Sequence, residues 1–402
     1  MKIIEIGTGY TPIPAKMGAA TEIVVEELTR SFLKIGQEVE IVDIATDNRA
    51  ENDLPISEVK VPKLFRKTDV SLGIMHKIKR VLYSIALAKY LKKLLKNTEE
   101  KLVLHFHNQY NLFFFLKLGS KKIRQKALIA YTNHSGFWSL PWEEVENTLK
   151  KRYFQEITAM KNADAVFVLN DRTRETVIER LEIPQERVFK INNGVNIDVY
   201  RPLEDFKIEQ IKAELGFSGK KIILQVGSVN ENKGQARAVA AFTPLLQANR
   251  DCVYVYAGGV ISEAYQAEVQ KVAKDNGIEE QVRYLGMIEP GAKLNEIYNI
   301  ADIALLISEY EGFPLVCIES LACGTPVILS CKAMQTFGDG CIPCTFEDLK
   351  DVADSILSQE ENKELSNLAR QNAVDQFSWD RVAKDYLKML CQNDANKRIE
   401  NA

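Results

Sequence analysis

The sequence predicts an α/β protein built from two doubly wound, mainly parallel sheets. A chain of 402 residues is longer than a single domain with one hydrophobic core usually is, so two domains are expected. Short apolar runs alternate with helical patterns from one end of the chain to the other, which is typical of parallel sheets covered by helices. The alternation pauses once, at the turn signal Asn192–Val195, and this pause places the junction between two sheets near residues 193–205.

Each predicted strand is a short apolar run bounded by turn signals. In the first half the predicted strands are Ile3–Ile6, Val39–Asp43, Leu102–Phe106, Ala127–Tyr131, Ala165–Leu169 and Val188–Ile191. The helical patterns between them include Glu22–Lys34, Met75–Lys96, Glu143–Lys161 and Arg172–Leu181. In the second half the predicted strands are Lys221–Val226, Cys252–Ala257, Val282–Leu285, Ile303–Leu306 and Val327–Leu329. Such sheets bind ligands at the carboxyl ends of their strands, so we expect the functional residues on loops that directly follow strands.

Charge and cysteine content narrow the classes of function. The net charge of -3 argues against a general binder of polyanions, and no RNA-binding motif is present, so we expect no nucleic acid partner. No signal peptide and no uncharged apolar run near the ~20 residues that span a bilayer are present, which favours a soluble, cytoplasmic protein. The odd count of seven cysteines predicts free thiols. Cys341 and Cys344 form a CxxC with Cys331 upstream, but a structural zinc site usually takes two such pairs, so we expect no metal there.

The segment with the clearest chemistry follows the predicted strand Ile303–Leu306. Glu311 lies in the loop before a predicted helix, Pro314 suits its first turn, and Glu319 lies about two turns in. A helix start offers backbone N–H groups and a positive dipole end to a phosphate, and two carboxylates beside it suit the hydroxyls of a ribose or a sugar. The alternative from spacing alone is a capped helix with solvated glutamates.

The stretch EGFPLVCIESLACGTPVI, with its Glu-x7-Glu spacing, resembles the donor-binding signature of the retaining GT-B glycosyltransferases of family 4. Three further stretches, 282–288, 294–308 and 376–383, are similar to other motifs of that family. The resemblance implies two Rossmann-like domains that face each other across a cleft. It implies an acceptor-binding domain over residues 1–195, a nucleotide-sugar-binding domain over 196–375, and a terminal helix over 376–402 that crosses back to the first domain.

The resemblance also implies roles for particular residues. Glu319 would bind the ribose hydroxyls of a nucleoside diphosphate sugar, Lys233 its diphosphate and Glu311 its sugar. Lys233 lies in Gly227–Gly234, which resembles the family's GRxxxxKG loop, but Ser228 replaces the arginine, and Arg237 is a candidate substitute. The implied catalytic residues are His134, Lys233 and Glu311. The implied donor-binding residues are Gly18, Ser228, Lys233, Ile288, Glu311, Gly312, Phe313, Pro314, Leu315, Val316 and Glu319.

The N-terminal glycine loop and the histidines complete the predicted site. The loop at Gly7 lacks the third glycine of a nicotinamide-binding motif, so the dinucleotide interpretation is weak. By resemblance, Gly18 is the first glycine of the family's GG pair and His134 lies beside the reacting sugar. His105 and His107 resemble the family's HxH, and we expect them on the wall of the cleft.

Residues 60–96 are strongly basic, and Ile78, Val81, Leu82 and Ile85 recur there at helical spacing. The pattern predicts an amphipathic helix whose basic face is either solvated or attracted to an anionic membrane surface.

The resemblance implies a retaining transfer from a UDP- or GDP-linked sugar to a glycan or lipid-linked acceptor, in surface polysaccharide or glycolipid synthesis. No Asp-x-Asp motif is present, so we expect no cofactor and no essential metal. The alternative is a nucleotide-sugar-binding protein without transferase activity, epimerase-like or regulatory.

Overall fold

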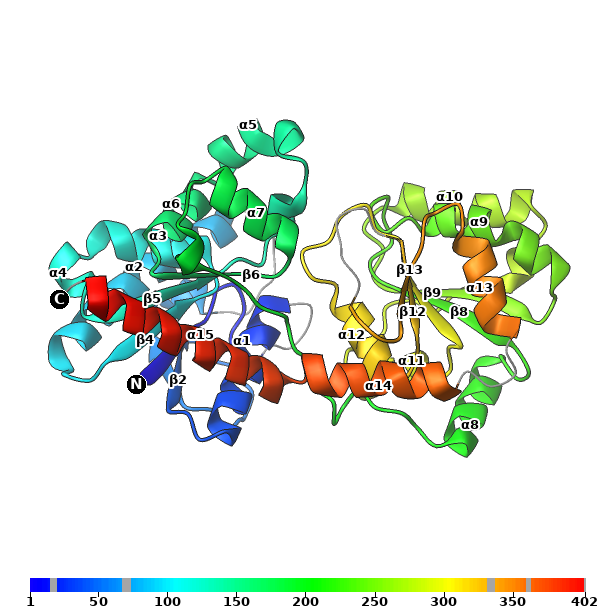
Figure 1. Ribbon diagram of the computed structural model, residues 1–402, viewed down its shortest axis with the longest axis horizontal. Coiled ribbons are helices and arrows are strands. Elements are labelled where there is room, and N and C mark those ends of the chain that lie inside the picture. Colours follow the sequence, from blue (N-terminus) through cyan, green and yellow to red (C-terminus); the bar gives the residue numbers. More distant parts are fainter. Residues whose placement is uncertain (15–19, 67–73, 331–336, 359–362, 401–402) are drawn as a thin grey trace. The chain divides into compact units, whose positions relative to one another are not determined.

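The computed structural model describes residues 1–14, 20–66, 74–330, 337–358 and 363–400. The chain forms two compact units. The first comprises Met1–Gly194 together with Trp379–Ala402, and the second comprises Val195–Ser378. The C-terminal helix α15 (Trp379–Glu400) therefore packs with the N-terminal residues, although the whole second unit separates them in the sequence. Each unit is an α/β fold around one sheet (Figure 1).

The first unit contains a parallel seven-stranded sheet in the order β3-β2-β1-β4-β5-β6-β7. Its strands are β1 (Lys2–Ile6), β2 (Val39–Ile44), β3 (Ile56–Val59), β4 (Leu102–Phe106), β5 (Ala127–Thr132), β6 (Ala165–Val168) and β7 (Val188–Lys190). Its other helices are α1 (Ala20–Lys34), α2 (Ile74–Asn97), α3 (Gln109–Leu118), α4 (Lys121–Arg124), α5 (Trp142–Arg152), α6 (Phe154–Asn162) and α7 (Asp171–Glu179). Three short 3₁₀ turns are η1 (Lys63–Phe65), η2 (Gly136–Ser139) and η3 (Gln185–Arg187).

Strand alternation divides this sheet into two buried faces. Ile4 and Ile6 of β1 join the main core cluster, which also contains Leu87 of α2. The side chains between them point to the opposite face because successive residues of a strand alternate. On that face Glu5 is buried, and the ring of Tyr386 from α15 lies 5.3 Å from the ring of His105. Polar side chains are therefore enclosed between the sheet and the C-terminal helix.

The second unit contains a parallel six-stranded sheet in the order β10-β9-β8-β11-β12-β13. Its strands are β8 (Lys221–Val226), β9 (Cys252–Ala257), β10 (Val282–Tyr284), β11 (Ile303–Leu306), β12 (Val327–Leu329) and β13 (Cys341–Pro343). Its helices are α8 (Asp205–Leu215), α9 (Gln235–Ala248), α10 (Glu263–Asp275), α11 (Ala292–Asn299), α12 (Leu315–Ala322), α13 (Leu349–Ser358) and α14 (Lys363–Phe377), with the 3₁₀ turn η4 (Glu279–Gln281).

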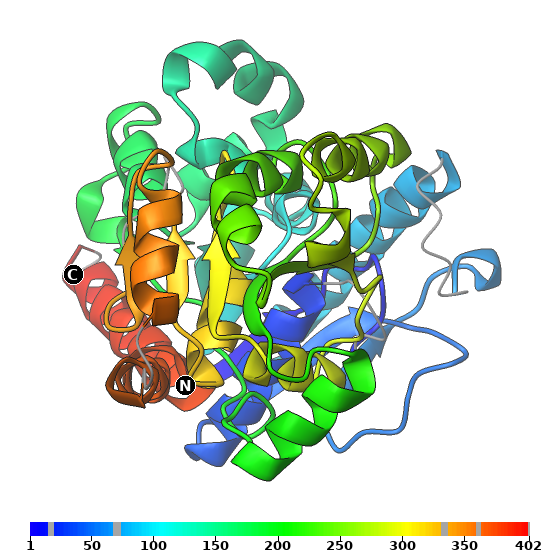
Figure 2. The ribbon, with the colours of Figure 1, turned by 90° about the vertical axis from the view of Figure 1, so that its right-hand side faces the viewer.

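Helices cover both faces of this second sheet (Figure 2). In β8, Ile222 packs in one core cluster with Ile318 of α12, whereas the next residue, Ile223, packs in another with Phe242 of α9. This alternation explains why the strand is apolar throughout. The α/β fold class predicted from the sequence is confirmed in both units.

The structure departs from the sequence predictions at three elements. Strands β3 and β13 were not predicted. The helix predicted over Glu143–Lys161 is two helices, because the backbone of Tyr153, at φ -115° and ψ 21°, leaves the helical region between α5 and α6. In β13, Cys341 is buried and its backbone pairs with β12 in the sheet, and Cys344 is half-buried. Cys331 lies outside the described residues.

The exposed face of α2 also differs from the prediction. Ile78 and Val81, expected among the apolar positions that dock the helix, are 42% and 36% exposed. The helix docks instead through its buried residues Tyr83, Leu87 and Leu91, and its exposed face carries apolar as well as basic side chains. Among the described residues, no helix has the length and apolar character needed to cross a membrane.

Candidate active site

The strand order of the second sheet reverses between β8 and β11: successive strands β9 and β10 follow on one side of β8, and β12 and β13 follow on the other side, beyond β11. In open α/β sheets ligands bind at this point, outside the carboxyl ends of the strands. Lys233 follows β8 and Glu311 follows β11, and their side chains form an ion pair. Both side chains are mostly buried, with 17% and 14% of their surface exposed. The fold thus brings two predicted site residues together from different parts of the chain.

Asn232 joins the two loops that carry this pair. Its backbone carbonyl accepts a hydrogen bond of 2.9 Å from the Glu309 N–H. Its side-chain oxygen accepts one of 3.2 Å from the Tyr310 N–H, and its Nδ2 donates to the Tyr310 carbonyl at 3.3 Å. Three hydrogen bonds from one residue hold the loops at a fixed separation, so the positions of Lys233 and Glu311 are set by backbone contacts as well as by their ion pair.

Ser228, which replaces the family arginine, has its own local partners. Its hydroxyl oxygen accepts a hydrogen bond from Asn230 Nδ2 at 2.8 Å, and its carbonyl accepts one from Gln235 Nε2 at 3.0 Å. Arg237, the candidate substitute, forms an ion pair with Glu309 and donates to the Ile307 carbonyl at 3.1 Å. Arg237 therefore lies against the loop after β11, and its charge is partly compensated there.

The start of α12 lies directly after this loop. Pro314 is the N-cap residue and is buried, and Leu315 and Val316 form the first turn. The first backbone N–H groups of a helix have no partner within it, so this turn presents donors next to Gly312 and Glu311. Phe313 fixes the approach to the helix by packing edge-on against Phe337 at 5.3 Å. Ile288, like Phe313, is half-buried against the core cluster that contains Ile318 of α12.

Glu319 lies on the second turn of α12 and is half-buried. The hydroxyl of Tyr298 donates to its Oε2 at 2.9 Å. Burial raises the pKa of the Glu319 carboxyl to about 6, although hydrogen bonds from Tyr298 and Tyr200 act in the opposite direction. The carboxylate is therefore held at a free-energy cost, which hydroxyl donors from a ligand would reduce.

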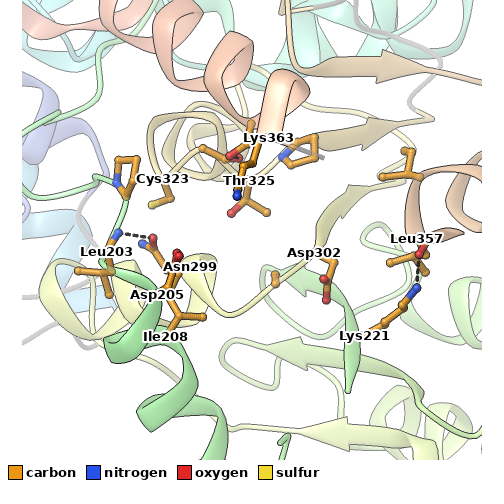
Figure 3. Close-up of a pocket in the computed structure, with 16 residues that line it drawn as sticks. Leu203, Asp205, Ile208, Lys221, Asn299, Asp302, Cys323, Thr325, Leu357 and Lys363 are labelled. Atoms are coloured by element: carbon orange, nitrogen blue, oxygen red, sulfur yellow. Dashed lines mark hydrogen bonds between the residues drawn. The ribbon is translucent and has the colours of Figure 1, made fainter. Parts of the chain in front are cut away.

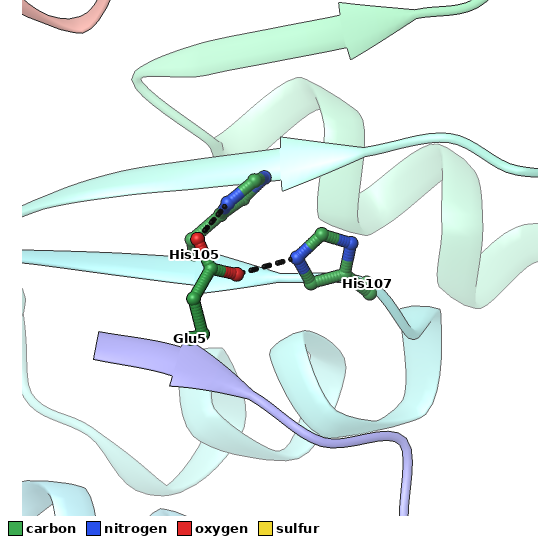
Figure 4. Close-up of side chains that lie close together, drawn as sticks. All are labelled: Glu5, His105 and His107. Carbon is green, nitrogen blue, oxygen red and sulfur yellow. Dashed lines mark hydrogen bonds and ion pairs between the residues drawn. The ribbon is translucent and has the colours of Figure 1, made fainter. Parts of the chain in front are cut away.

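The first sheet has the same kind of reversal, between β1 and β4, and a polar cluster lies there (Figure 4). Glu5 accepts hydrogen bonds from His105 Nδ1 at 2.9 Å and from His107 Nε2 at 2.7 Å. His107 Nδ1 lies 3.0 Å from Nε2 of His134, which is half-buried. His105 Nε2 lies 2.7 Å from the Thr132 hydroxyl.

Ligand atoms of Glu5, His105 and His107 lie within 4.8 Å of one another, a spacing that a metal ion could use. However, each of the four ring nitrogens of the two histidines already has a hydrogen-bond partner. Hydrogen bonding thus satisfies the side chains of Glu5, His105 and His107. His105 and His107 were expected on a cleft wall, but they are 0% and 5% exposed and lie inside the unit.

Sequence reasoning missed three members of this cluster, which are Glu5, Thr132 and Tyr386. Glu5 could have been noticed as a carboxylate inside an otherwise apolar strand, since such residues are almost never buried without partners. Tyr386, whose hydroxyl lies 3.2 Å from that of Thr132, gives no such signal. Gly18, predicted to line the site, lies outside the described residues.

A cavity of about 740 Å³ in the second unit lies at the other edge of the sheet (Figure 3). Its lining includes Lys221, Asp302 and Pro326, which stand at the starts of β8, β11 and β12. Asp302 accepts a hydrogen bond from the Ile222 N–H at 2.7 Å, which links the starts of the neighbouring strands β8 and β11. Because these are the amino ends of the strands, the cavity is separate from the Lys233–Glu311 site.

Two Rossmann-like units, each with a polar or charged cluster at the reversal point of its sheet, define a two-domain protein of the doubly wound α/β class. Models of known families match both halves of the chain. Residues 21–199 match Glycosyltransferase Family 4, and residues 207–376 match Glycosyl transferases group 1. The chain belongs to family 4 of the glycosyltransferases, a family of transferase enzymes.

Individual relatives are distant. Mannosylfructose-phosphate synthase of Agrobacterium fabrum is 22% identical over 260 residues, which cover 61% of this chain and 57% of that protein. The match thus spans little more than half of that relative. Sucrose-phosphate synthase of Thermosynechococcus elongatus has a similar structure, with a TM-score of 0.73, 19% identity, and coverage of 98% of this chain and 100% of that one. The structure of HepE of Anabaena in complex with UDP has a TM-score of 0.71 and 16% identity, and the match covers 97% of this chain and 100% of that one. These structures share the fold.

Proposed function

We propose that this protein is a retaining glycosyltransferase that moves a sugar from a nucleoside diphosphate sugar to a glycan or lipid-linked acceptor. The donor would be UDP- or GDP-linked, and the product would belong to a surface polysaccharide or a glycolipid. The Lys233–Glu311 pair carries the proposal, because it sets one cation and one carboxylate beside a helix start at a sheet reversal. The complexes of HepE with UDP, and with UDP and glucose, support a donor of this chemistry.

The ion pair suggests how the donor enters. The diphosphate would take the Lys233 ammonium, and the N–H groups of Leu315 and Val316 would bind its other oxygens. Glu311, released from Lys233, would then accept hydrogen bonds from hydroxyls of the sugar. Glu319 would accept hydrogen bonds from the ribose. Each charged group would exchange an internal partner for one on the donor.

The same groups would act during transfer. Negative charge grows on the diphosphate as the bond to the sugar breaks, and a fixed ammonium and fixed N–H dipoles stabilise it without reorganisation. Retention would follow if the acceptor hydroxyl attacks from the side of the leaving group. Lys233 and the α12 start would supply the positive charge, and we propose that transfer needs no metal ion.

A panel of thermal shifts with UDP, GDP, ADP and their sugar derivatives tests the donor proposal. A ligand at 100 times its dissociation constant stabilises the folded state by about 2.7 kcal/mol. Lys233→Ala removes a charge-assisted hydrogen bond, so its affinity should fall about ten- to a hundredfold. Lys220→Ala is the matched control, since Lys220 pairs with Asp251 at the amino end of β8. A wild-type protein indifferent to every nucleotide, or a Lys233→Ala protein with an unchanged shift, would contradict the proposal.

The exposed face of α2 supports contact with an anionic membrane. Met75 and Ile78 are 49% and 42% exposed, and Leu64 of the turn η1, which precedes α2 in the chain, is 69% exposed. Further along the same helical stripe stand the exposed Lys89 and Lys93. Apolar side chains can enter the interface while each lysine near the surface adds about 1 kcal/mol of attraction. We propose that this surface brings the enzyme to lipid-linked acceptors.

Vesicle sedimentation tests this surface. Binding should be stronger to phosphatidylglycerol than to phosphatidylcholine vesicles, and it should weaken with added salt. The double variant Leu64→Asp, Ile78→Asp should lose most of the bound fraction. Phe206→Asp is the control, because Phe206 is 68% exposed but lies on α8 in the second unit. Equal binding of the double variant and of wild type would refute the membrane contact.

A further inference from the structure

The buried cluster at β1 and β4 has a defined direction of hydrogen bonding. Glu5 and His105 are neighbours across the two parallel strands, and both are fully buried. An ionised carboxylate only accepts hydrogen bonds. His105 and His107 lower the pKa of Glu5 to about 2 even though burial opposes this, so the carboxylate is ionised. It therefore requires an N–H from each of the two rings.

This requirement fixes the proton of His107. The ring nitrogen that faces Glu5 is Nε2, at 2.7 Å, so Nε2 carries the hydrogen. Burial, together with the nearby His105, lowers the pKa of His107 to about 4, so its ring is neutral near pH 7. A neutral imidazole has one N–H, and Nδ1 of His107 is consequently a hydrogen-bond acceptor.

The tautomer of His107 in turn determines the proton position on His134. Its Nε2 lies 3.0 Å from the acceptor Nδ1 of His107, so Nε2 carries the proton of His134. Burial, together with His107 and His105, holds the pKa of His134 well below its usual range, and its ring is also neutral. Its Nδ1 is left with a lone pair. Among the described residues, the hydrogen bond found for the His134 ring is the one at Nε2.

We propose that Glu5 is a positioning residue that, through His107, fixes His134 in the tautomer that accepts a hydrogen bond at Nδ1. The ligand group at Nδ1 would be a sugar hydroxyl, an assignment that rests on the proposed function. An accepting nitrogen orients the hydroxyl hydrogen toward the protein and selects a hydroxyl over any group that cannot donate. A site built to hydrogen-bond a hydroxyl rejects an analogue that lacks it.

The second arm of the cluster provides an internal control. His105 binds the other carboxylate oxygen of Glu5, and its Nε2 faces the Thr132 hydroxyl, which lies 3.2 Å from the hydroxyl of Tyr386. Tyr386→Phe removes one hydroxyl from this arm and leaves the contacts of His107 intact. It should alter thermal stability without changing the proton position on His134.

Nuclear magnetic resonance of protein with ¹⁵N-labelled histidine measures the tautomer directly. Only four histidines are present, and a His134→Gln spectrum assigns the signal. At pH 7 without ligand, the wild-type His134 should show a protonated Nε2 and a bare Nδ1, and Tyr386→Phe should show the same. Glu5→Leu, an apolar replacement of similar size, should give a mixture of the two tautomers. A wild-type His134 protonated at Nδ1 would overturn the proposal even if no variant folds, as would a stoichiometric metal ion bound to the purified protein.

Kinetics separate this inference from the proposed function. Glu5→Leu should reduce kcat/KM about tenfold, the scale of one hydrogen bond. The thermal shift caused by the nucleoside diphosphate alone should stay unchanged, because its proposed site lies in the second unit. Sugar substrates that carry hydrogen or fluorine in place of the contacted hydroxyl should be equally poor, since fluorine cannot donate a hydrogen bond. A fluoro sugar that reacts faster than the deoxy sugar would overturn the inference but leave the transferase proposal intact. Failure of all nucleotide sugars to bind would refute the function but leave the tautomer measurement standing.

Discussion

Glu319→Gln should make the protein more stable and its donor binding weaker. The pKa of Glu319 is about 6 in the fold, against an ordinary value of 4.5. The folded state therefore binds the proton more tightly than the unfolded state does, and folding stability falls as the pH rises from about 4.5 to about 6. Each pH unit between the two pKa values corresponds to about 1.4 kcal/mol, so ionised Glu319 costs up to ~2 kcal/mol at pH 7.5.

Glutamine still accepts the hydrogen bond from Tyr298 but never ionises. The variant should gain up to ~2 kcal/mol at pH 7.5, which corresponds to a rise in Tm of ~4–8 °C for a unit of this size. At pH 5 less than half of the gain should remain. Scanning calorimetry at the two pH values measures the difference, with Glu209→Gln on the exposed face of α8 as control. An equal gain at both pH values, or no gain at pH 7.5, would show that the carboxylate is not held at a cost.

Three further predictions follow from the same physical arguments. Tyr298→Phe removes a hydrogen bond that lowers the pKa of Glu319, so the pH at which donor affinity is half lost should rise above about 6, as a titration of affinity against pH would show. Arg49→Ala leaves the fully buried Asp43 carboxylate without its ion-pair partner, and urea unfolding should show a loss of ~3–5 kcal/mol. If Lys233 and the α12 start neutralise the leaving group, chelation of divalent metals should leave the transfer rate unchanged, and a rate restored by Mg²⁺ would contradict that view.

Much of the fold follows from local patterns. The strands Leu102–Phe106, Lys221–Val226 and Cys252–Ala257 were predicted with the bounds that the structure gives them. A buried parallel strand is a short run of apolar residues between polar loops, and this can be recognised without knowing its neighbours. Strand β3 (Ile56–Val59) was missed because it is an edge strand with exposed and half-buried positions, so its sequence alternates weakly.

The candidate site shows where local patterns stop being sufficient. The sequence by itself determined which residues follow β8 and β11, and hence that Lys233 and Glu311 belong to loops at one edge of a sheet. Only the tertiary structure decided that these two pair, that Ile78 faces outward, and that Glu5 and Tyr386 belong to one buried network. Strand order and helix docking are set by packing between segments far apart in the chain. The partner of a buried charge is therefore a property of the assembled unit, and the residues on either side of that charge do not specify it.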